Sequence, residues 1–214
     1  MTTYAIVVPV AYLLGATPWG YIIPRLLRGV DIRRYGSGNV GGANVQRTVG
    51  WRLAIVVMAL DVGKGVLAVA LAWLVSGHSA VAEVVAGIMA IIGHDWSVFL
   101  RFKGGRGVAA AGGASFIIAP LATAAVLPVF LLTVLRSRYV SLGSVVGALA
   151  LPAIFCAFAA FGIYDWTYVY LYVVATPLVV FHHRGNMKRL IRGTERKLGE
   201  PAQPIPPPRE EGAT

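Results

Sequence analysis

Long apolar stretches alternate with short polar segments rich in glycine along most of this chain. A transmembrane helix needs about 20 consecutive, mainly apolar residues. Stretches of this kind occupy residues 4–24, 51–76, 80–100, 140–162 and 166–182. The pattern therefore predicts an all-α membrane protein, folded as a polytopic bundle of transmembrane helices.

The stretch at residues 108–135 does not fit a single span, because it is long and contains Pro120 and Pro128. Proline lacks a backbone N–H and interrupts or kinks a helix. We predict two short helices here, which form either a re-entrant pair or two tilted crossings. The tail at residues 199–214 is polar and rich in proline, so we expect it to be disordered. Residues 1–198 are then expected to form a single membrane domain.

The basic residues predict the topology. Apart from Lys64 inside a span, they fall in residues 25–52, 101–106, 136–138 and the C-terminal region, whereas the connections at 77–80 and 163–165 carry none. Basic loops stay in the cytoplasm, so we expect a cytoplasmic C-terminus and an outer N-terminus. That arrangement needs an odd number of crossings, either five or seven. The apolar N-terminus has no basic leader, which favours an uncleaved first span over a signal peptide.

The composition limits the classes of function. The chain has 19 Lys and Arg against 9 Asp and Glu, a net charge of +10. A nucleic-acid partner is not expected, because the basic residues lie between apolar segments and not on one soluble face. The single Cys156 excludes an intrachain disulfide. The four histidines lack acidic neighbours at ligand spacing, apart from the adjacent Asp95, so no metal site is expected.

Residues 36–47, named here the first glycine loop, are the main polar interruption of the chain. Glycine allows a backbone to approach a ligand closely, and successive N–H groups can form a concave anion site. An arginine adds a forked donor for phosphate or carboxylate. The alternative is a flexible connecting loop. The candidate residues are Gly36, Ser37, Gly38, Asn39, Gly41, Asn44 and Arg47.

Residues 103–107, named here the second glycine loop, directly precede a helix of small residues. Cations and glycines at a helix N-terminus favour phosphate binding, although the loop lacks the Walker A pattern. The alternative is a cluster of charge that only fixes topology. The candidates are Lys103, Gly104, Gly105, Arg106 and Gly107.

Other polar residues are open to two interpretations. Asp61 and Lys64 lie three residues apart on one helical face, either as an orienting pair or as a functional one. His183 follows the last span and is either an acid–base group or an interfacial side chain. Ser141 is a helix N-cap by default. The basic run at residues 188–197 is expected to lie on anionic headgroups.

Five of these blocks, in this order, resemble the bacterial integral-membrane acyl-phosphate:glycerol-3-phosphate acyltransferases. The family pattern has a GSGN-x-GATN-x-x-R loop, a D-x-x-KG helix, a GH-x-x-PVF-x-x-F-KGGKGVAT block, an SLG triplet and a late H-x-x-N-I-x-RL. The corresponding segments here are residues 36–47, 61–65, 93–110, 141–143 and 183–190. The resemblance covers about residues 10–195.

The resemblance implies about seven spans in the bacterial cell membrane, with the site on the cytoplasmic side. It implies acyl transfer from acyl phosphate to the 1-hydroxyl of glycerol 3-phosphate, which gives lysophosphatidic acid and phosphate in the first step of phospholipid synthesis. The expected partners are these two substrates and membrane lipids, with no cofactor. The residues expected in catalysis are Ser37, Asn39, His183 and Asn186. Those expected to bind substrate phosphates are Ser141, Arg47 and both glycine loops.

The sequence departs from the pattern at several positions. Ala43 and Ala110 replace threonine, and Arg106 replaces lysine, which keeps the charge but changes its geometry. A lost hydroxyl donor costs about 1–3 kcal/mol, which is compatible with activity. Two alternatives stay open at this point: an inactive homologue that binds phospholipid precursors, and an organophosphate or anion transporter. The transporter is disfavoured because no inverted repeat is evident.

Overall fold

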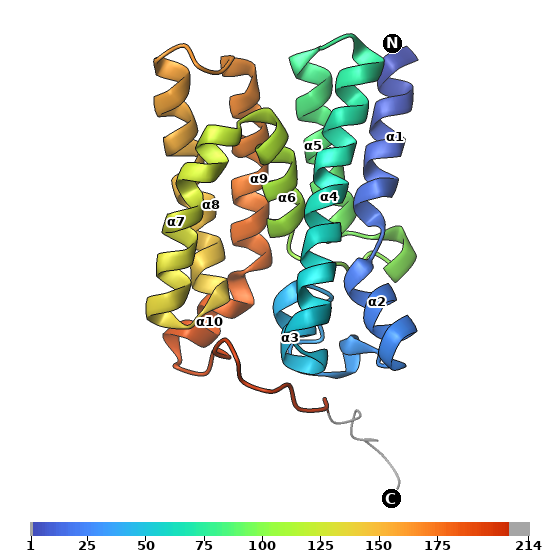
Figure 1. Cartoon of the computed structure of the whole chain (residues 1–214), viewed down its shortest axis with the longest axis vertical. Coiled ribbons are helices and arrows are strands. Elements are labelled where there is room, and N and C mark those ends of the chain that lie inside the picture. Colours follow the sequence, from blue (N-terminus) through green and yellow to red (C-terminus); the bar gives the residue numbers. More distant parts are fainter. Residues whose placement is uncertain (1, 206–214) are drawn as a thin grey trace, which may run out of the picture.

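Every regular element of the computed structural model, which describes residues 2–205, is a helix (Figure 1). No strand occurs in this part of the chain, where the only bridge joins Tyr35 and Pro204. The elements are α1 (Thr2–Ala16), α2 (Trp19–Arg28), η1 (Ile32–Arg34), α3 (Gly42–Val49), α4 (Trp51–Ser76), α5 (Ala80–Asp95), η2 (Val98–Leu100), α6 (Val108–Ile118), α7 (Pro120–Ser137), α8 (Val140–Ala160), η3 (Trp166–Tyr168), α9 (Val169–His182) and α10 (Arg184–Ile191).

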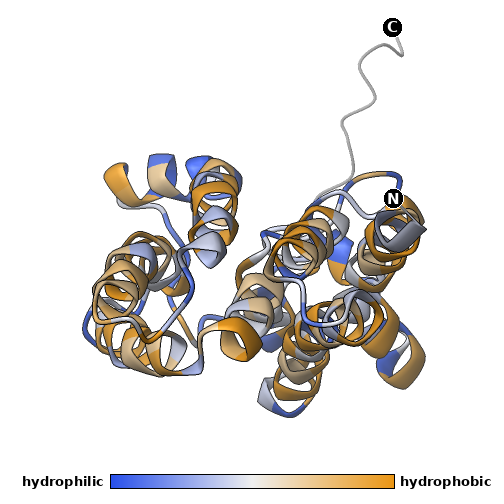
Figure 2. Cartoon of the chain, turned by 90° about the horizontal axis from the view of Figure 1, so that it is seen from above, coloured by the Kyte–Doolittle hydropathy of each residue, from blue (hydrophilic) through white to orange (hydrophobic). Residues whose placement is uncertain are grey.

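The helices match the expected membrane class. Five helical stretches within residues 2–205 are long and apolar enough to cross a membrane. They are Thr2–Arg28, Trp51–Ser76, Ala80–Leu100, Pro120–Ser137 and Val140–Ala160. Two further helices are apolar but shorter, Val108–Ile118 and Trp166–His182. Hydrophobic residues predominate along the helices in Figure 2. The all-α membrane class is confirmed, while the number of crossings stays a prediction.

The chain breaks between α6 and α7, within the stretch that was expected to hold two helices. Ala119 leaves the helical conformation, with φ −140° and ψ 70°, and Pro120 opens α7. A residue before proline is disfavoured in the helical region, whereas proline fits the first turn of a helix. Pro128 lies inside α7 without ending it. The two helices turn back on each other at this break (Figure 1).

The span expected over residues 4–24 falls within the apolar helical stretch Thr2–Arg28, but this stretch is interrupted. Helix α1 ends at Ala16 and α2 begins at Trp19, with Pro18 between them. Pro18 cannot donate a backbone hydrogen bond, so the helical ladder is interrupted there. The break exposes the carbonyl of Thr17, which accepts a hydrogen bond from Lys64 at 3.0 Å.

Glycines allow two pairs of helices to touch through their backbones. A Cβ on Gly15 or Gly93 would collide with the backbone of the opposite helix in the α1–α5 pair. A Cβ on Gly65 or Gly113 would do the same in the α4–α6 pair. Small residues at such contacts are the usual means of helix packing in membranes. These contacts fix the height of α6, and therefore of the loop before it.

The described part of the tail differs from the expectation of disorder from residue 199. The Ala202 N–H donates to the Arg47 carbonyl at 3.0 Å, and the Ile205 N–H donates to the Arg34 carbonyl at 2.8 Å. In return, the Gly36 N–H donates to the Gln203 carbonyl at 2.9 Å. Three backbone hydrogen bonds thus join residues 202–205 to η1 and to both ends of the first glycine loop. Residues 206–214 lie outside the described residues.

The polar segments gather at one end of the bundle. Figure 1 shows α3, α10 and the C-terminal segment at this end, whereas the N-terminus and the connections α4–α5 and α8–α9 lie at the other. Regions far apart in sequence are therefore neighbours at the polar end.

Candidate active site

A single cavity of about 420 Å³ brings most of the candidate residues together. Its polar end is lined by both glycine loops and by the ends of α8, α9 and α10, and its other part is apolar. The candidates that line it are Ser37, Asn39, Gly41, Asn44, Arg47, Arg106, Ser141, His183 and Asn186. Gly36, Gly38, Lys103, Gly104, Gly105 and Gly107 do not line it.

Asn44 shapes the first glycine loop from inside. It is buried, and its side-chain oxygen accepts the Ser37 N–H at 3.1 Å. Its amide donates to the carbonyls of Ile32, Tyr35 and Asn39, the last at 2.9 Å. An asparagine amide has only two hydrogens to donate. Asn44 therefore holds the loop and has no amide hydrogen left for a substrate, contrary to the binding role expected for it.

Ser37 and Asn39 form the rim of the cavity. The Asn39 side-chain oxygen accepts the Gly41 N–H at 2.8 Å, and its amide donates to the Gly104 carbonyl at 3.4 Å. Asn39 thus connects the two glycine loops. The Ser37 hydroxyl accepts the Asn39 N–H at 3.4 Å and keeps its own proton to donate.

Arg47 lies between the cavity and the tail. Its guanidinium donates to the carbonyls of Arg196 at 3.1 Å and Lys197 at 3.4 Å. Burial lowers the pKa of this guanidinium, which nevertheless stays charged at neutral pH. Arg47 therefore holds the segment after α10 against the first glycine loop and brings positive charge to the polar end of the cavity.

Two of the glycine amides in the second glycine loop are already used within the protein. The N–H groups of Gly104 and Gly105 donate to the carbonyls of Asp95 at 3.0 Å and His94 at 2.8 Å. The Lys103 side chain is exposed, whereas Arg106 is partly buried and lines the cavity. The loop thus continues the end of α5, and it presents one of its two cations to the site.

Arg106 is one of two arginines in the cavity wall whose guanidinium has no hydrogen-bond partner within residues 2–205, and the other is Arg196. Burial lowers the pKa of the Arg106 guanidinium to about 10. The group is still charged at neutral pH. A partly buried arginine with five unused donors is suited to bind an anion such as phosphate.

His183 presents a neutral ring to the cavity. Its Nδ1 lies 2.8 Å from the Val179 carbonyl, which can only accept, so Nδ1 carries the proton. Burial lowers the pKa of the ring to about 4, and the charge of Arg106 contributes. At neutral pH the imidazole is therefore uncharged, with an unprotonated Nε2 available as an acceptor.

Glu195 organises the far side of the polar end, and we did not identify it from the sequence. This buried carboxylate accepts hydrogen bonds from Ser141 at 2.9 Å, Asn186 at 2.6 Å and Arg189 at 2.7 Å. The candidates Ser141 and Asn186 are thus linked by a residue that had been grouped with the basic run at residues 188–197. Its acidic side chain within that run was the signal available in the sequence.

Asp61 and Lys64 form a buried ion pair, and Asp61 also lines the cavity. Lys64 Nζ lies 2.9 Å from an Asp61 oxygen, and His94 Nδ1 lies 3.6 Å from the same oxygen. Since Lys64 also bonds the Thr17 carbonyl, the group connects α4 to α5 and to the break after α1. These contacts support a structural role for the pair, and the position of Asp61 in the cavity wall is compatible with a functional one.

The comparisons with known proteins agree over nearly the whole chain. Residues 5–193 match the model of the glycerol-3-phosphate acyltransferase family. The chain belongs to this family. It is 47% identical to glycerol-3-phosphate acyltransferase 2 of Moorella thermoacetica, over 89% of this chain and 95% of the relative. It is 41% identical to glycerol-3-phosphate acyltransferase 3 of Dehalococcoides mccartyi strain 195, over 91% and 95%.

Two solved structures share the fold of this acyltransferase family member. Both are crystal structures of PlsY (YgiH), an integral membrane glycerol 3-phosphate acyltransferase, in a glycerol 3-phosphate form and a lysophosphatidic acid form. Their TM-scores are 0.84 and 0.82, at 34% identity, and each covers 93% of this chain and 96% of the other. The resemblance inferred from the polar blocks is confirmed.

The departures from the family pattern fall in two environments. Ala43 lines the cavity, so a hydroxyl is missing from the wall of the site. Ala110 is fully buried, where its carbonyl faces Gly65 at the α4–α6 contact. Ser97, which stands in place of proline, is buried and donates to the Ala16 carbonyl, so it secures the end of α1.

Proposed function

We propose that this chain transfers a fatty acyl group from acyl phosphate to the 1-hydroxyl of glycerol 3-phosphate, with lysophosphatidic acid and phosphate as products. One observation carries the proposal: a single cavity joins a cationic polar end, with the unpartnered Arg106, to an apolar part within the helices. Both substrates carry a phosphate and one carries an acyl chain. The printed names of the relatives and of the two PlsY structures support the same reaction.

The proposed chemistry needs positioning more than a nucleophile from the protein. The substrate hydroxyl oxygen attacks the acyl carbonyl carbon, and the bond from that carbon to the phosphate oxygen breaks. Acyl phosphate is an activated mixed anhydride, so alignment and charge stabilisation supply the catalysis. Arg106 and Arg47 neutralise the phosphates, and the released phosphate carries away the electrons of the broken bond. The reaction balances without a cofactor.

His183 and Asn186 are proposed to orient the attacking hydroxyl. The unprotonated Nε2 of His183 accepts a hydrogen bond from that hydroxyl, and Asn186 is held in place by Glu195. A substrate phosphate then takes the proton, because its basicity exceeds that of an imidazole with a pKa of about 4. Ser37 and Asn39 contribute neutral donors at the rim. Ser141 donates its only proton to Glu195, so its oxygen can serve the substrate only as an acceptor on the opposite side.

We further propose that the protein is a multi-pass protein of the bacterial plasma membrane, with about seven crossings and the cavity on the cytoplasmic side. The support is the gathering of basic segments at the polar end and the absence of Lys and Arg from the connections at 77–80 and 163–165. Labelling of single cysteines in intact cells tests this, after Cys156 has been replaced. A cysteine at position 163 should react with an impermeant maleimide, and one at position 103 should not.

The reaction is tested with detergent-purified protein, glycerol 3-phosphate and either hexadecanoyl phosphate or hexadecanoyl-CoA. Lysophosphatidic acid should form from the acyl phosphate alone, with an equal amount of phosphate. Turnover with acyl-CoA only would contradict the proposed donor. Binding of glycerol 3-phosphate without turnover of either donor, by protein that unfolds cooperatively, would favour the inactive homologue.

A further inference from the structure

The apolar part of the cavity has a defined depth. Along α8 the lining residues run from Ser141 past Gly147 to Leu151, and along α9 they run from His183 to Tyr172. These are paths of ten and eleven residues, which span about 15 Å in an α-helix. Acyl tails of one leaflet fill half of a hydrocarbon core about 30 Å thick. The cavity is therefore as deep as one ordinary acyl chain is long in a membrane.

A cluster of three hydroxyls lies at the deep end. Thr123 of α7 donates to the Ala119 carbonyl at 3.0 Å. Since each hydroxyl has one proton, Ser115 of α6 donates to Thr123 at 2.7 Å, and Tyr172 of α9 donates to Ser115 at 2.9 Å. Every proton of the cluster is used. The cluster joins three of the helices that form the walls.

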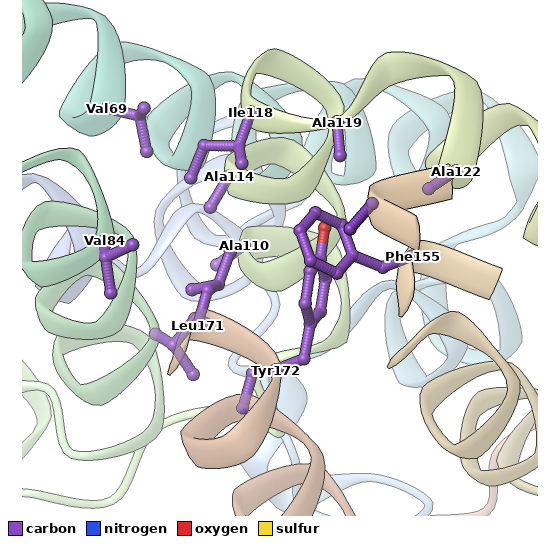
Figure 3. Close-up of a cluster of buried hydrophobic side chains, with 13 residues drawn as sticks. Val69, Val84, Ala110, Ala114, Ile118, Ala119, Ala122, Phe155, Leu171 and Tyr172 are labelled. Atoms are coloured by element: carbon purple, nitrogen blue, oxygen red, sulfur yellow. The ribbon is translucent and has the colours of Figure 1, made fainter. Parts of the chain in front are cut away.

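Behind this cluster the interior is closed. Phe155 is fully buried, and its ring lies 4.8 Å from that of Tyr172 between centroids. Figure 3 shows the Tyr172 ring beside Phe155, near Ala119 and Ala122. These residues belong to one packed hydrophobic cluster, and Phe155, Ala119 and Ala122 do not line the cavity.

We infer that the Tyr172 ring, with the hydroxyls of Ser115 and Thr123, forms a floor that sets the longest acyl chain this protein transfers efficiently. A longer chain would have to separate hydroxyls that have no water to replace their partners, which is unfavourable in an apolar interior. This inference rests on the proposed function, since it assigns the apolar part of the cavity to the acyl group of the donor.

The test is the dependence of kcat/KM on acyl-chain length, from octanoyl to docosanoyl phosphate. A general loss of stability lowers kcat/KM for every chain length but does not move the chain length at which kcat/KM is highest. In Gly147→Leu the new side chain projects into the cavity about 9 Å from Ser141. A Cβ there would lie 3.7 Å from the Phe130 Cβ, an ordinary contact. The ratio of kcat/KM for hexadecanoyl phosphate to that for octanoyl phosphate should fall about tenfold or more.

Gly63→Leu is the matched control, because Gly63 lies on α4 outside the cavity with open space around it.

The floor itself is tested with a pair of substitutions at one position. Tyr172→Ala should move the maximum towards longer chains, while Tyr172→Phe keeps the ring and should leave it in place. If Tyr172→Ala does not fold, the Gly147→Leu profile still decides the path of the chain. Unchanged profiles in the folded variants would overturn the inference. Absence of turnover with every acyl phosphate in the unmodified protein would instead contradict the proposed function.

Discussion

At the scale of single residues, the site combines charge with groups that are held in place by neighbours. Within residues 2–205 the Arg106 guanidinium has no hydrogen-bond partner, whereas Arg47 is already bonded to the carbonyls of residues 196 and 197. Arg106 is thus more available to a phosphate than Arg47. Ser141 and Asn186 owe their orientation to Glu195, which neither of their own sequence blocks contains.

His183 provides a prediction about pH. Its pKa of about 4 lies below the ordinary value of 6.5, so the folded state prefers the neutral ring. This contribution to stability is complete above about pH 6.5 and is lost as the pH falls towards 4. The activity of the unmodified protein should therefore show no step from this ring between about pH 6 and 8. His183→Gln should lower kcat about tenfold, as expected for the loss of one orienting hydrogen bond, without altering the shape of the profile in that range.

The measurement is the pH dependence of kcat for both proteins at matched amounts of folded enzyme. An unchanged rate in His183→Gln would remove this residue from the mechanism. A step near pH 6.5 in the unmodified protein alone would contradict the neutral ring.

At the scale of elements, close contacts between helices place the second glycine loop. Gly113 of α6 packs against the backbone of Val62, so a larger residue would push α6 away from α4. Gly113→Leu should destabilise the protein by about 1–3 kcal/mol or more, as other overpacked cores do. It should also reduce activity, because Arg106 lies just before α6.

Thermal unfolding in detergent checks this, with Gly63→Leu again as the control. The control has open space around its Cβ and replaces glycine by a better helix former. Equal stability of the two variants would show that the α4–α6 contact does not matter.

Some helix boundaries follow from the sequence, whereas contacts between the helices and the loops do not. The apolar stretches and the break before Pro120 were predictable, because they follow from hydropathy and from the geometry of proline. The break at Pro18 was missed because apolar residues continue on both sides of it. The hydrogen bonds from the amides of Gly104 and Gly105 could not be foreseen, since their acceptors lie nine and eleven residues earlier, at the end of α5.

At the scale of the whole molecule, the polar end is assembled from segments distant in sequence. The hydrogen bonds from Gly36 and Ala202 join the tail to the first glycine loop, and that from Ile205 joins it to Arg34 just before this loop. The sequence predicted no such role, because polar, proline-rich composition gives no sign of backbone pairing with a remote loop.

Truncation after Leu198 should therefore loosen the first glycine loop. Each net hydrogen bond contributes about 1 kcal/mol, so KM for glycerol 3-phosphate should rise about three- to tenfold, with a lower melting temperature. A chain that ends at Ile205 keeps these contacts and serves as the control. Equal KM values for the two truncated proteins would contradict a role of the tail in holding the loop.

The central claim is that the cavity with Arg106 at its polar end is the substrate site. It is tested most directly by kcat/KM for glycerol 3-phosphate and for acyl phosphate in Arg106→Gln and Lys103→Gln, which remove one positive charge each from the same loop. Arg106→Gln should lower kcat/KM for at least one of the two about 100-fold, as expected for a lost charged hydrogen bond of about 3 kcal/mol. Lys103→Gln should stay within about threefold of the unmodified enzyme, because its side chain is exposed. Equal losses in the two variants, or a loss in Lys103→Gln alone, would contradict the account.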